Sequence, residues 1–274
     1  MADDTRTVTF HVRRFDPDKD PAPHYKSYKV PVKPGMVVLD GLWYIKENLD
    51  ASLAWRVSCR MGVCGSCGML LNGRPTLACN TQILDIASED LVVAPLPNFP
   101  VVRDLLPDLT ATFEKHRTAM PFIVREDPSV LDSTEGEHFQ TPEELEHYLQ
   151  FTYCIKCGCC SAACPTFATD TEYLTPLVLA QAYRYNVDTR DGGWKARAEL
   201  VGGTHGAFRC HYAGECSRVC PKGGDPAKAI QLLKRQLVMD YLHLAKKQKP
   251  CAMLHGAGEG KPMPDIPPAP ARTV

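Results

Sequence analysis

Hydrophobic and polar residues alternate in two stretches near the start of the chain, at 8–12 and at 28–32. Because successive side chains of a strand point to opposite faces, both stretches predict strands with one buried face. Residues 38–49 instead space their hydrophobic side chains by four, three and four positions, which predicts a helix. Asn72-Gly73 then predicts a tight hairpin turn between two short strands. Together these elements predict a small β-grasp domain.

Helical patterns dominate the chain beyond a proline-punctuated segment at 95–107. Thr141-Pro142 and Thr175-Pro176 each offer an N-cap residue followed by a proline at the first helical position. Asp225-Pro226 begins a longer helix, whose hydrophobic stripe over 230–244 predicts packing against a core. We therefore expect an α+β protein with a β-grasp domain at 1–106, an all-α domain at 107–250 and an irregular tail at 251–274.

Composition and charge narrow the class of protein without changing this picture. Of the 274 residues, 23% are charged and 44% hydrophobic, and the net charge of −1 gives no indication of a nucleic-acid partner. No stretch reaches the ~18 consecutive apolar residues of a membrane span. The polar N-terminus lacks the apolar region of a signal peptide. These features predict a chain that stays in a reducing cytoplasm. They are compatible with docking onto a membrane-embedded partner.

Thirteen cysteines at short spacings provide the candidate chemistry. Secreted disulfide scaffolds are usually shorter, so the clustering favours metal binding. Cys59, Cys64 and Cys67 have the C-x4-C-x2-C spacing of plant-type ferredoxins, and Cys79 follows after eleven residues. These four thiolates are the predicted ligands of a [2Fe–2S] cluster. Glycines, which let the backbone approach the sulfur atoms closely, are interleaved with them at Gly62, Gly65 and Gly68.

A second spacing, C-x2-C-x2-C-x3-C-P, extends from Cys154 to Pro165 and is typical of bacterial ferredoxins. A later run repeats its first, third and fourth positions and its proline. In two-cluster ferredoxins the fourth cysteine of each run binds the other cluster. The predicted [4Fe–4S] ligands are therefore Cys154, Cys157, Cys160 and Cys220.

Ala213 stands at the second position of the later run, where a cysteine would complete the pattern. The remaining cluster keeps three thiolates, from Cys164, Cys210 and Cys216, which predicts a [3Fe–4S] cluster. The alternative is a labile fourth iron held by a bound water or by another side chain, because the aliphatic Ala213 cannot bind it. We interpret Cys159 as a small buried hydrophobic residue and Cys251 as a spare thiol.

Two other classes of protein also carry clustered cysteines, but the sequence fits them less well. A zinc-stabilised interaction protein would usually bring its ligands as two paired knuckles, which the first cysteine set does not do. A free-standing soluble ferredoxin conflicts with the length of the chain and with the fused second cysteine module.

The residues around the cysteines resemble those of the iron–sulfur subunit of succinate dehydrogenase and fumarate reductase, the respiratory complex II family. The resemblance covers about residues 6–245 in order. It is carried by Ser58 to Gly68, by Cys154 to Pro165 with Cys210 to Pro221, and by Ala182 to Asp191.

This resemblance implies an electron-transfer subunit of an enzyme complex that does not itself bind the dicarboxylate. Electrons from FAD of a flavoprotein partner would pass through [2Fe–2S], [4Fe–4S] and [3Fe–4S] to a membrane quinone. A membrane anchor, often with haem b, would hold the subunit on the cytoplasmic side of the cytoplasmic membrane. Succinate oxidation is the leading direction. The alternatives are that the same subunit works in a quinol:fumarate reductase, or that it is the iron–sulfur subunit of another membrane flavin dehydrogenase.

Pro165 and His211 match family positions that line the quinone site, and each directly follows a predicted ligand of the three-iron cluster. An alternative interpretation of His211 is a histidine packed beside its cluster. Many ubiquinone-reducing members carry tryptophans shortly after the Cys-Pro pair, whereas this chain has Thr166 to Thr169 with none. The resemblance therefore favours menaquinone as the quinone.

Overall fold

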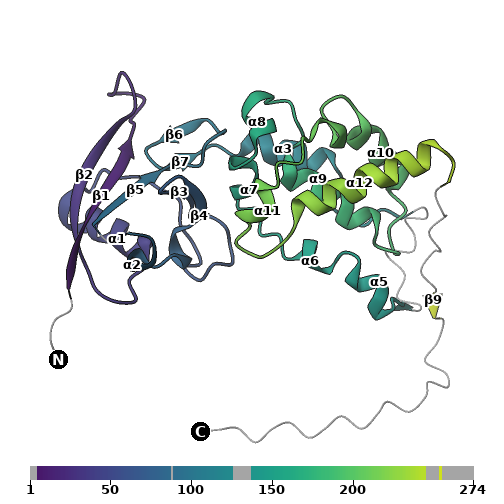
Figure 1. The fold of residues 1–274 in the computed structure, drawn as a ribbon, viewed down its shortest axis with the longest axis horizontal. Helices are drawn as coiled ribbons and strands as arrows, with labels where there is room; N and C mark the ends of the chain where they lie inside the picture. The colour runs from purple at the N-terminus through teal and green to yellow at the C-terminus, as the bar shows by residue number, and fades with distance from the viewer. Residues whose placement is uncertain (1–4, 88, 126–136, 245–252, 255–274) are drawn as a thin grey trace, which may run out of the picture.

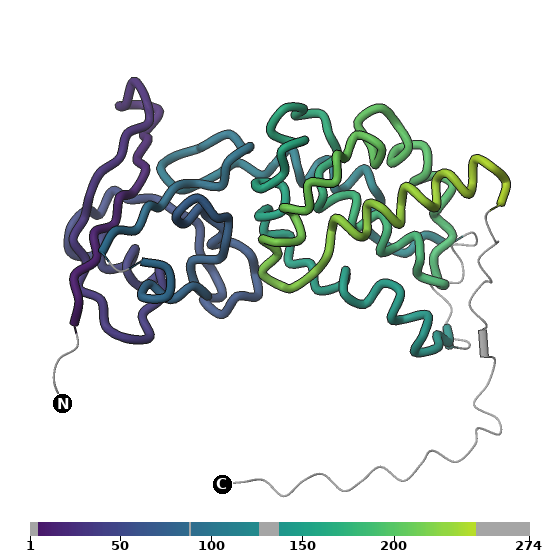
Figure 2. Tube along the Cα trace, in the orientation of Figure 1, coloured from purple at the N-terminus to yellow at the C-terminus, as the bar shows by residue number. Residues whose placement is uncertain are grey.

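The computed structural model describes residues 5–87, 89–125, 137–244 and 253–254 as two modules that lie side by side (Figure 1). A sheet with short helices forms one end of the molecule, and a group of helices forms the other. The chain trace crosses from sheet to helices near residue 100 (Figure 2). No helix in the described ranges is long and apolar enough to cross a membrane.

The first module is a five-stranded sheet in the order β2-β1-β5-β3-β4. β1 and β5 are parallel neighbours, and the other pairs are antiparallel. This mixed sheet with its short helices agrees with the predicted β-grasp fold. Its elements are β1 (Arg6–Arg14), β2 (His24–Val32), α1 (Val38–Tyr44), η1 (Ile45–Leu49), β3 (Gly68–Leu71), β4 (Arg74–Leu77), η2 (Ala78–Asn80), α2 (Ile83–Ile86) and β5 (Asp90–Ala94).

The alternating stretches form the strands that they predict. Val8, Phe10 and Val12 are fully buried on one face of β1, which pairs with β2 along its whole length. Asn72 and Gly73, with φ of 45° and 79°, make the turn between β3 and β4. The helix predicted at 38–49 is present as α1 and its π-helical continuation η1. Its buried face ends at Ile45, because Leu49 is exposed.

The second module consists mainly of short helices arranged around α9 and α12, which pack against each other. One small antiparallel pair, β6–β7, lies in the connecting segment. A second pair, β8–β9, accompanies the helices, so the module is not purely helical. The elements from the connecting segment onward are β6 (Val101–Arg103), β7 (Leu106–Pro107), α3 (Thr110–Thr118), β8 (Glu137–His138), α5 (Pro142–Glu146), α6 (Leu149–Thr152), α7 (Cys159–Ala162), α8 (Pro165–Thr169), α9 (Thr175–Asn186), α10 (Trp194–Gly202), η3 (Ala207–Arg209), α11 (Glu215–Arg218), α12 (Pro226–Tyr241) and β9 (Met253–Leu254).

Helices begin at both predicted Thr-Pro pairs, but only one of the two threonines is the N-cap. Thr141 caps α5, since its hydroxyl accepts from the Glu144 N–H at 3.2 Å and the Glu144 carboxylate accepts from the Thr141 N–H at 2.8 Å. For α9 the N-cap is Leu174 instead. Thr175 has a φ of +70°, and its buried hydroxyl has no hydrogen-bond partner among the described residues. This left-handed conformation separates the hydroxyl from the N–H groups that it was predicted to cap.

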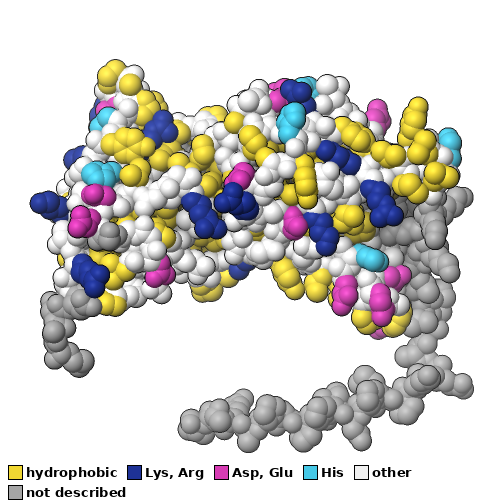
Figure 3. Space-filling view, in the orientation of Figure 1, with side chains coloured by type: hydrophobic (Ala, Val, Ile, Leu, Met, Phe, Trp, Pro, Cys, Tyr) yellow, Lys and Arg dark blue, Asp and Glu magenta, His cyan; other side chains and the backbone are white. Residues whose placement is uncertain are grey.

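The hydrophobic stripe of α12 is buried only over its first half. Ile230 and Leu233 lie in the core, whereas Tyr241 and Leu244 are 83% and 60% exposed. Hydrophobic side chains are visible at this end of the molecule in Figure 3. The prediction of a buried stripe is therefore wrong for the last turns, because no described element covers them.

The tail that was predicted to be irregular contains one short strand. β9 pairs with β8, with Met253 opposite His138 and Leu254 opposite Glu137. Cys251 and residues 255–274 lie outside the described residues.

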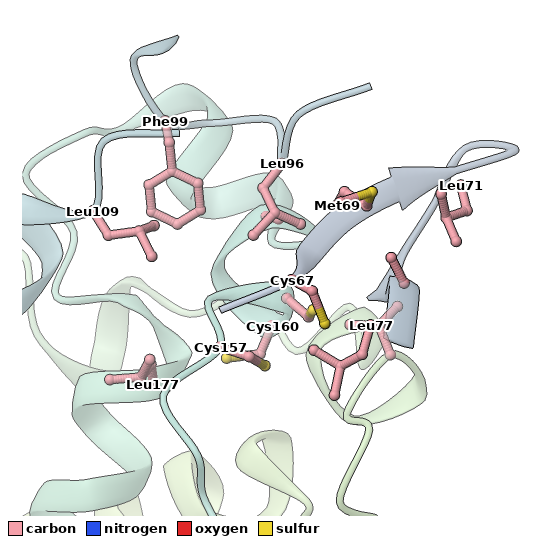
Figure 4. Close-up of a cluster of buried hydrophobic side chains, with 14 of the residues drawn as sticks. Cys67, Met69, Leu71, Leu77, Leu96, Phe99, Leu109, Cys157, Cys160 and Leu177 are labelled. Atoms are coloured by element: carbon pink, nitrogen blue, oxygen red, sulfur yellow. The ribbon is translucent and has the colours of Figure 1, made fainter. Parts of the chain in front are cut away.

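A single buried cluster of side chains runs through both modules. Where they meet, Leu96 and Phe99 of the connecting segment lie with Cys67 of the first module and Cys157 of the second (Figure 4). Because one core spans the junction, the cysteine-bearing loops of the two modules are held in a defined position relative to each other.

Candidate iron–sulfur centres

The first cysteine loop turns backbone N–H groups toward its sulfur atoms. Cys59 Sγ accepts from the N–H groups of Val63 and Cys64 at 3.3 and 3.2 Å. Cys79 Sγ accepts from the Gly62 N–H at 3.2 Å. Hydrogen bonds of this kind stabilise a charged sulfur, whether it is a free thiolate or bound to iron.

The four cysteines of this first group range from buried to exposed. Cys79 belongs to the 3-10 turn η2 rather than to a strand, and it is buried, as is Cys67. Burial raises the pKa of Cys67 to about 12. Cys64 is exposed, and hydrogen bonds from the Ser66 hydroxyl and from backbone N–H groups lower its pKa to about 6.

The second group of cysteines surrounds one apolar hollow of about 40 Å³. Burial raises the pKa of the Cys160 thiol well above its usual value, and the neighbouring cysteine sulfurs add to this effect. Buried thiols of this kind ionise readily only when a metal supplies positive charge. The hollow is lined by all four predicted ligands of the [4Fe–4S] cluster, Cys154, Cys157, Cys160 and Cys220.

The two ferredoxin-like runs have the same backbone conformation. Lys156 and Gly158 have φ of 56° and 84°, and the residues at the corresponding positions of the later run, Tyr212 and Gly214, have 59° and 76°. Gly158 precedes α7 and Gly214 precedes α11 in the same way. Counting along these matched backbones places Ala213 opposite Cys157. The structure therefore supports the alignment of the two runs independently of the cysteine spacing.

The three remaining cysteines gather around a tyrosine. Burial, together with the nearby sulfurs of Cys164 and Cys210, raises the pKa of Cys216 to about 12. Tyr173 is fully buried, and no nitrogen or oxygen atom in the described part of the chain accepts from its hydroxyl. Burial, the charges of the same three sulfurs and a hydrogen bond toward Cys210 raise the pKa of Tyr173. A buried donor with only cysteine sulfurs beside it fits a site that receives an acceptor, such as the sulfides of a cluster.

Sequence patterns did not identify Tyr173 as a site residue. It lies nine positions after Cys164, outside any ligand spacing, and an isolated tyrosine in a loop carries no distinctive pattern. Only the fold brings it among the sulfur atoms.

The remaining candidate residues lie close to these groups in the chain. Cys159 is fully buried, as expected of a small hydrophobic residue, and its thiol hydrogen-bonds Cys157. Pro165 and His211 are exposed, and each directly follows a sulfur of the third group. Ala213 is also exposed, and its methyl group offers no metal ligand.

The three groups of sulfur atoms form a series. Gly65 of the first loop packs against Cys157, since a Cβ built on Gly65 would lie 2.9 Å from the Cys157 Cα. Cys67, Cys157 and Cys160 belong to one buried cluster (Figure 4). Cys160 in turn lies near Cys216 of the third group, whose charge contributes to its raised pKa.

The donor set suits clusters better than single ions. Every cysteine in the described ranges is a free thiol. In those ranges no three His, Cys, Asp or Glu side chains converge as the ligands of one metal ion. In a [4Fe–4S] or [3Fe–4S] cluster each thiolate binds a different iron atom, and in a [2Fe–2S] cluster two thiolates bind each of the two irons, so the ligands of a cluster stand farther apart than those of a single ion. Soft thiolates, backbone N–H donors and apolar walls together fit iron–sulfur clusters.

Comparisons with known families agree with this arrangement. Residues 9–114 match the 2Fe-2S iron-sulfur cluster binding domain, and residues 150–224 match the 4Fe-4S dicluster domain. Among solved structures, a chain of the Mycobacterium smegmatis Sdh1 complex in the apo form has a TM-score of 0.74 and 28% identity, covering 87% of this chain and 98% of that one.

Curated relatives extend the match over most of the chain. A fumarate reductase iron-sulfur subunit of Mycobacterium tuberculosis is 44% identical, over 83% of this chain and 91% of the relative. One of Haemophilus influenzae is 42% identical, over 88% and 97%. A mitochondrial succinate dehydrogenase [ubiquinone] iron-sulfur subunit of Candida glabrata is 39% identical, over 86% and 93%. The chain therefore belongs to the family of iron–sulfur subunits of succinate dehydrogenase and fumarate reductase.

Proposed function

We propose that this chain is the electron-transfer subunit of a succinate:quinone oxidoreductase, and that it connects FAD of a flavoprotein subunit with a membrane quinone, menaquinone. The bound clusters supply one-electron carriers, and the chain supplies their ligands, their hydrogen bonds and their burial. The observation that carries the proposal is the series of three sulfur groups along one continuous core.

In this proposal each sulfur group holds a different cluster. The free thiols, the apolar hollow and the matched backbones of the two runs support this assignment. The [2Fe–2S] ligands are Cys59, Cys64, Cys67 and Cys79; the [4Fe–4S] ligands are Cys154, Cys157, Cys160 and Cys220; the [3Fe–4S] ligands are Cys164, Cys210 and Cys216.

We further propose domains at 1–106 and 107–250 and a tail at 251–274, of which β9 pairs with β8. The division into two domains is supported by the five-stranded sheet, whose last strand in the chain is β5, and by the helices of the second module, the first of which is α3.

The two ends of the series offer surfaces for two different partners. Beside the exposed Cys64, Met61 and Val63 are 71% and 53% exposed and supply an apolar face for the flavoprotein. Beside Cys210, Phe208 and Tyr212 are 54% and 61% exposed. There the membrane anchor, with or without haem b, and the quinone at Pro165 and His211 would meet the chain on the cytoplasmic side of the membrane.

Potentiometric EPR on membranes that contain the assembled complex tests this function. We expect three signals with separate midpoint potentials, including a [3Fe–4S] signal in the oxidised state, and menaquinone among the extracted quinones. A complex with full iron content and no [3Fe–4S] signal would contradict the third ligand set. Extraction of ubiquinone alone would contradict the quinone assignment.

Fumarate reduction is the second candidate function, with electrons travelling in the opposite direction through the same ligands. It is favoured by the names of the Mycobacterium tuberculosis and Haemophilus influenzae relatives, both fumarate reductase subunits. The rates of succinate oxidation by quinone and of fumarate reduction by quinol, measured on the same membranes, distinguish the two directions.

A further inference from the structure

The junction between the two modules brings a glycine of the first cysteine loop against a predicted ligand of the second cluster. Gly65 lies between Cys64 and Cys67 and has a φ of +74°. A Cβ at this position would stand 2.9 Å from both Cα and Cβ of Cys157, and 3.0 Å from the Ile155 carbonyl oxygen. These are backbone atoms and the first side-chain atom, so no flexible side chain can move aside to make room.

Gly68 of the same loop repeats the contact at a slightly longer distance. Its Cβ would stand 3.1 Å from the Cys157 carbonyl oxygen and 3.3 Å from Leu96 Cδ1. Two glycines that flank Cys67 therefore face one residue of the other module. At both glycines the backbone of the first cysteine loop therefore packs closely against Cys157.

Hydrogen bonds hold the two modules together beside this contact. The Asn98 side-chain amide donates to the carbonyl oxygens of Ser161, Ala162 and Cys164 at 3.2, 2.8 and 3.3 Å. Arg74 donates to the Arg218 carbonyl oxygen at 3.1 Å. The modules cannot slide apart freely, so a side chain added at Gly65 must displace the cysteine loops themselves.

We propose that Gly65 is a positioning residue for electron transfer, and that its missing side chain sets the separation between the first and second clusters. The proposal rests on the proposed function, because it takes the ligand sets given there. Electron tunnelling between buried carriers slows steeply with distance. A methyl group at Gly65 would stand 2.9 Å from Cys157, so the two segments must move apart until this distance reaches an ordinary 3.4 Å or more. The larger separation slows the transfer between these two clusters while every thiolate ligand stays in the chain.

Two substitutions separate packing from backbone strain. Asparagine tolerates a positive φ better than alanine does, yet its side chain is larger. If packing against Cys157 matters, Gly65→Asn has a larger effect than Gly65→Ala; if strain matters, the order reverses. Gly73 offers the matched control, because it has a φ of +79° and a Cβ there would meet nothing within 4 Å. Gly62→Ala, whose Cβ would make ordinary contact with Asn80 at 3.6 Å, controls for changes in the cysteine loop itself.

The experiment uses the assembled complex reduced with dithionite, so that both clusters are paramagnetic. We measure iron and sulfide content, the microwave-power saturation of the [2Fe–2S] EPR signal, and the rate of electron transfer between the two clusters. We expect unchanged iron and sulfide content in all variants. The [2Fe–2S] signal should saturate at the lowest microwave power, and electron transfer should be slowest, in Gly65→Asn. Gly65→Ala should lie between Gly65→Asn and the wild type. The Gly73→Asn and Gly73→Ala variants should match the wild type.

Wild-type coupling and rate in a fully loaded Gly65→Asn variant would overturn the positioning role and leave the proposed function intact. If this variant does not assemble, Gly65→Ala provides the same test. Effects of equal size in Gly62→Ala and Gly65→Ala would assign the change to the cysteine loop and also overturn the role. Two reduced signals that do not interact in the wild type would instead contradict the proposed ligand sets.

Discussion

Ala213 shows how one side chain changes the chemistry of a site whose backbone stays the same. The later run follows the Cys154–Cys160 conformation closely enough to place Ala213 opposite Cys157. A methyl group cannot bind iron, so the third group of sulfur atoms has one ligand fewer than the second. In the proposed ligand sets, the difference between the two clusters therefore comes from this side chain and not from the shape of the loop.

Replacing Ala213 by cysteine should supply the missing thiolate. We expect Ala213→Cys to convert the third cluster to [4Fe–4S], with loss of the oxidised [3Fe–4S] EPR signal and an additional iron atom per chain. Ala213→Val, which adds volume without a ligand, should keep the original signal. An unchanged spectrum and iron content in Ala213→Cys would show that the two runs are aligned wrongly.

The buried Tyr173 hydroxyl offers a second test at this scale. A hydrogen bond donated to a cluster sulfur stabilises the reduced, more negative state. We expect Tyr173→Phe to lower the midpoint potential of the third cluster by roughly 60 mV. For a one-electron couple this shift equals about 1.4 kcal/mol, a tenfold change in the redox equilibrium constant, which is the size expected for one hydrogen bond that favours the reduced state. EPR redox titration measures it, with Tyr28→Phe in the first module as control. The same potential in Tyr173→Phe and wild type would contradict this role.

At the scale of elements, one carboxylate connects two loops beside the third group. Asp170, which ends α8, accepts from His205 Nδ1 at 3.0 Å and from Arg209 Nε at 2.9 Å. The Leu174 N–H also donates to the His205 carbonyl oxygen at 2.9 Å. The segment that carries Tyr173 is thereby joined to the segment that leads into Cys210. Exact placement of both depends on this connection.

Acid should weaken this connection within a defined pH range. The hydrogen bond from His205, together with Arg209, lowers the pKa of Asp170 to about 2. A carboxylate whose pKa is lowered by folding contributes stability that is fully present above its unfolded pKa of about 3.9 and is lost as the pH falls toward 2. At pH 7 the wild type should unfold at a higher urea concentration than Asp170→Asn. We expect this difference between the two urea midpoints to shrink as the pH falls below about 4. A difference that stays constant down to pH 2.5 would contradict this account.

At the scale of the whole molecule, the junction joins two modules into one core. The cysteine loops belong to different modules, and their relative position depends on the buried cluster around Leu96 and Phe99 and on Asn98. Asn98 has a φ of +67°, a conformation that asparagine tolerates better than most residues. One residue thus combines an unusual backbone with three hydrogen bonds across the junction.

Removal of the Asn98 amide should loosen the contact between the modules. Asn98→Gly keeps the positive φ without strain, so its effect isolates the hydrogen bonds; we expect a loss of about 1–3 kcal/mol in unfolding free energy. Hydrogen exchange of the α7 amides should become faster. Asn72→Gly, the same substitution in the β3–β4 turn, should leave exchange at α7 unchanged. Wild-type protection of α7 in Asn98→Gly would show that Asn98 does not hold the junction.

The local features of this protein were readable from the order of its residues. Alternation predicted β1 and β2, Asn72-Gly73 predicted the hairpin, and cysteine spacing predicted which thiols lie together. Each depends on residues close in the chain or on a repeated template. The capping of α9 was predicted wrongly, because the positive φ of Thr175 arises from how the chain enters the helix and leaves no local pattern.

Features that depend on residues far apart in the chain were decided by the tertiary structure alone. Examples are Tyr173 among the three sulfurs, Asn98 at the end of α7, and Gly65 against Cys157. By itself the sequence determined the spacing of the cysteines and the absence of a thiol at Ala213, and the proposed ligand sets follow from residue type and spacing. The separation between the cysteine loops was decided only by folding, because the packing of one module against the other sets a distance that neither segment encodes alone.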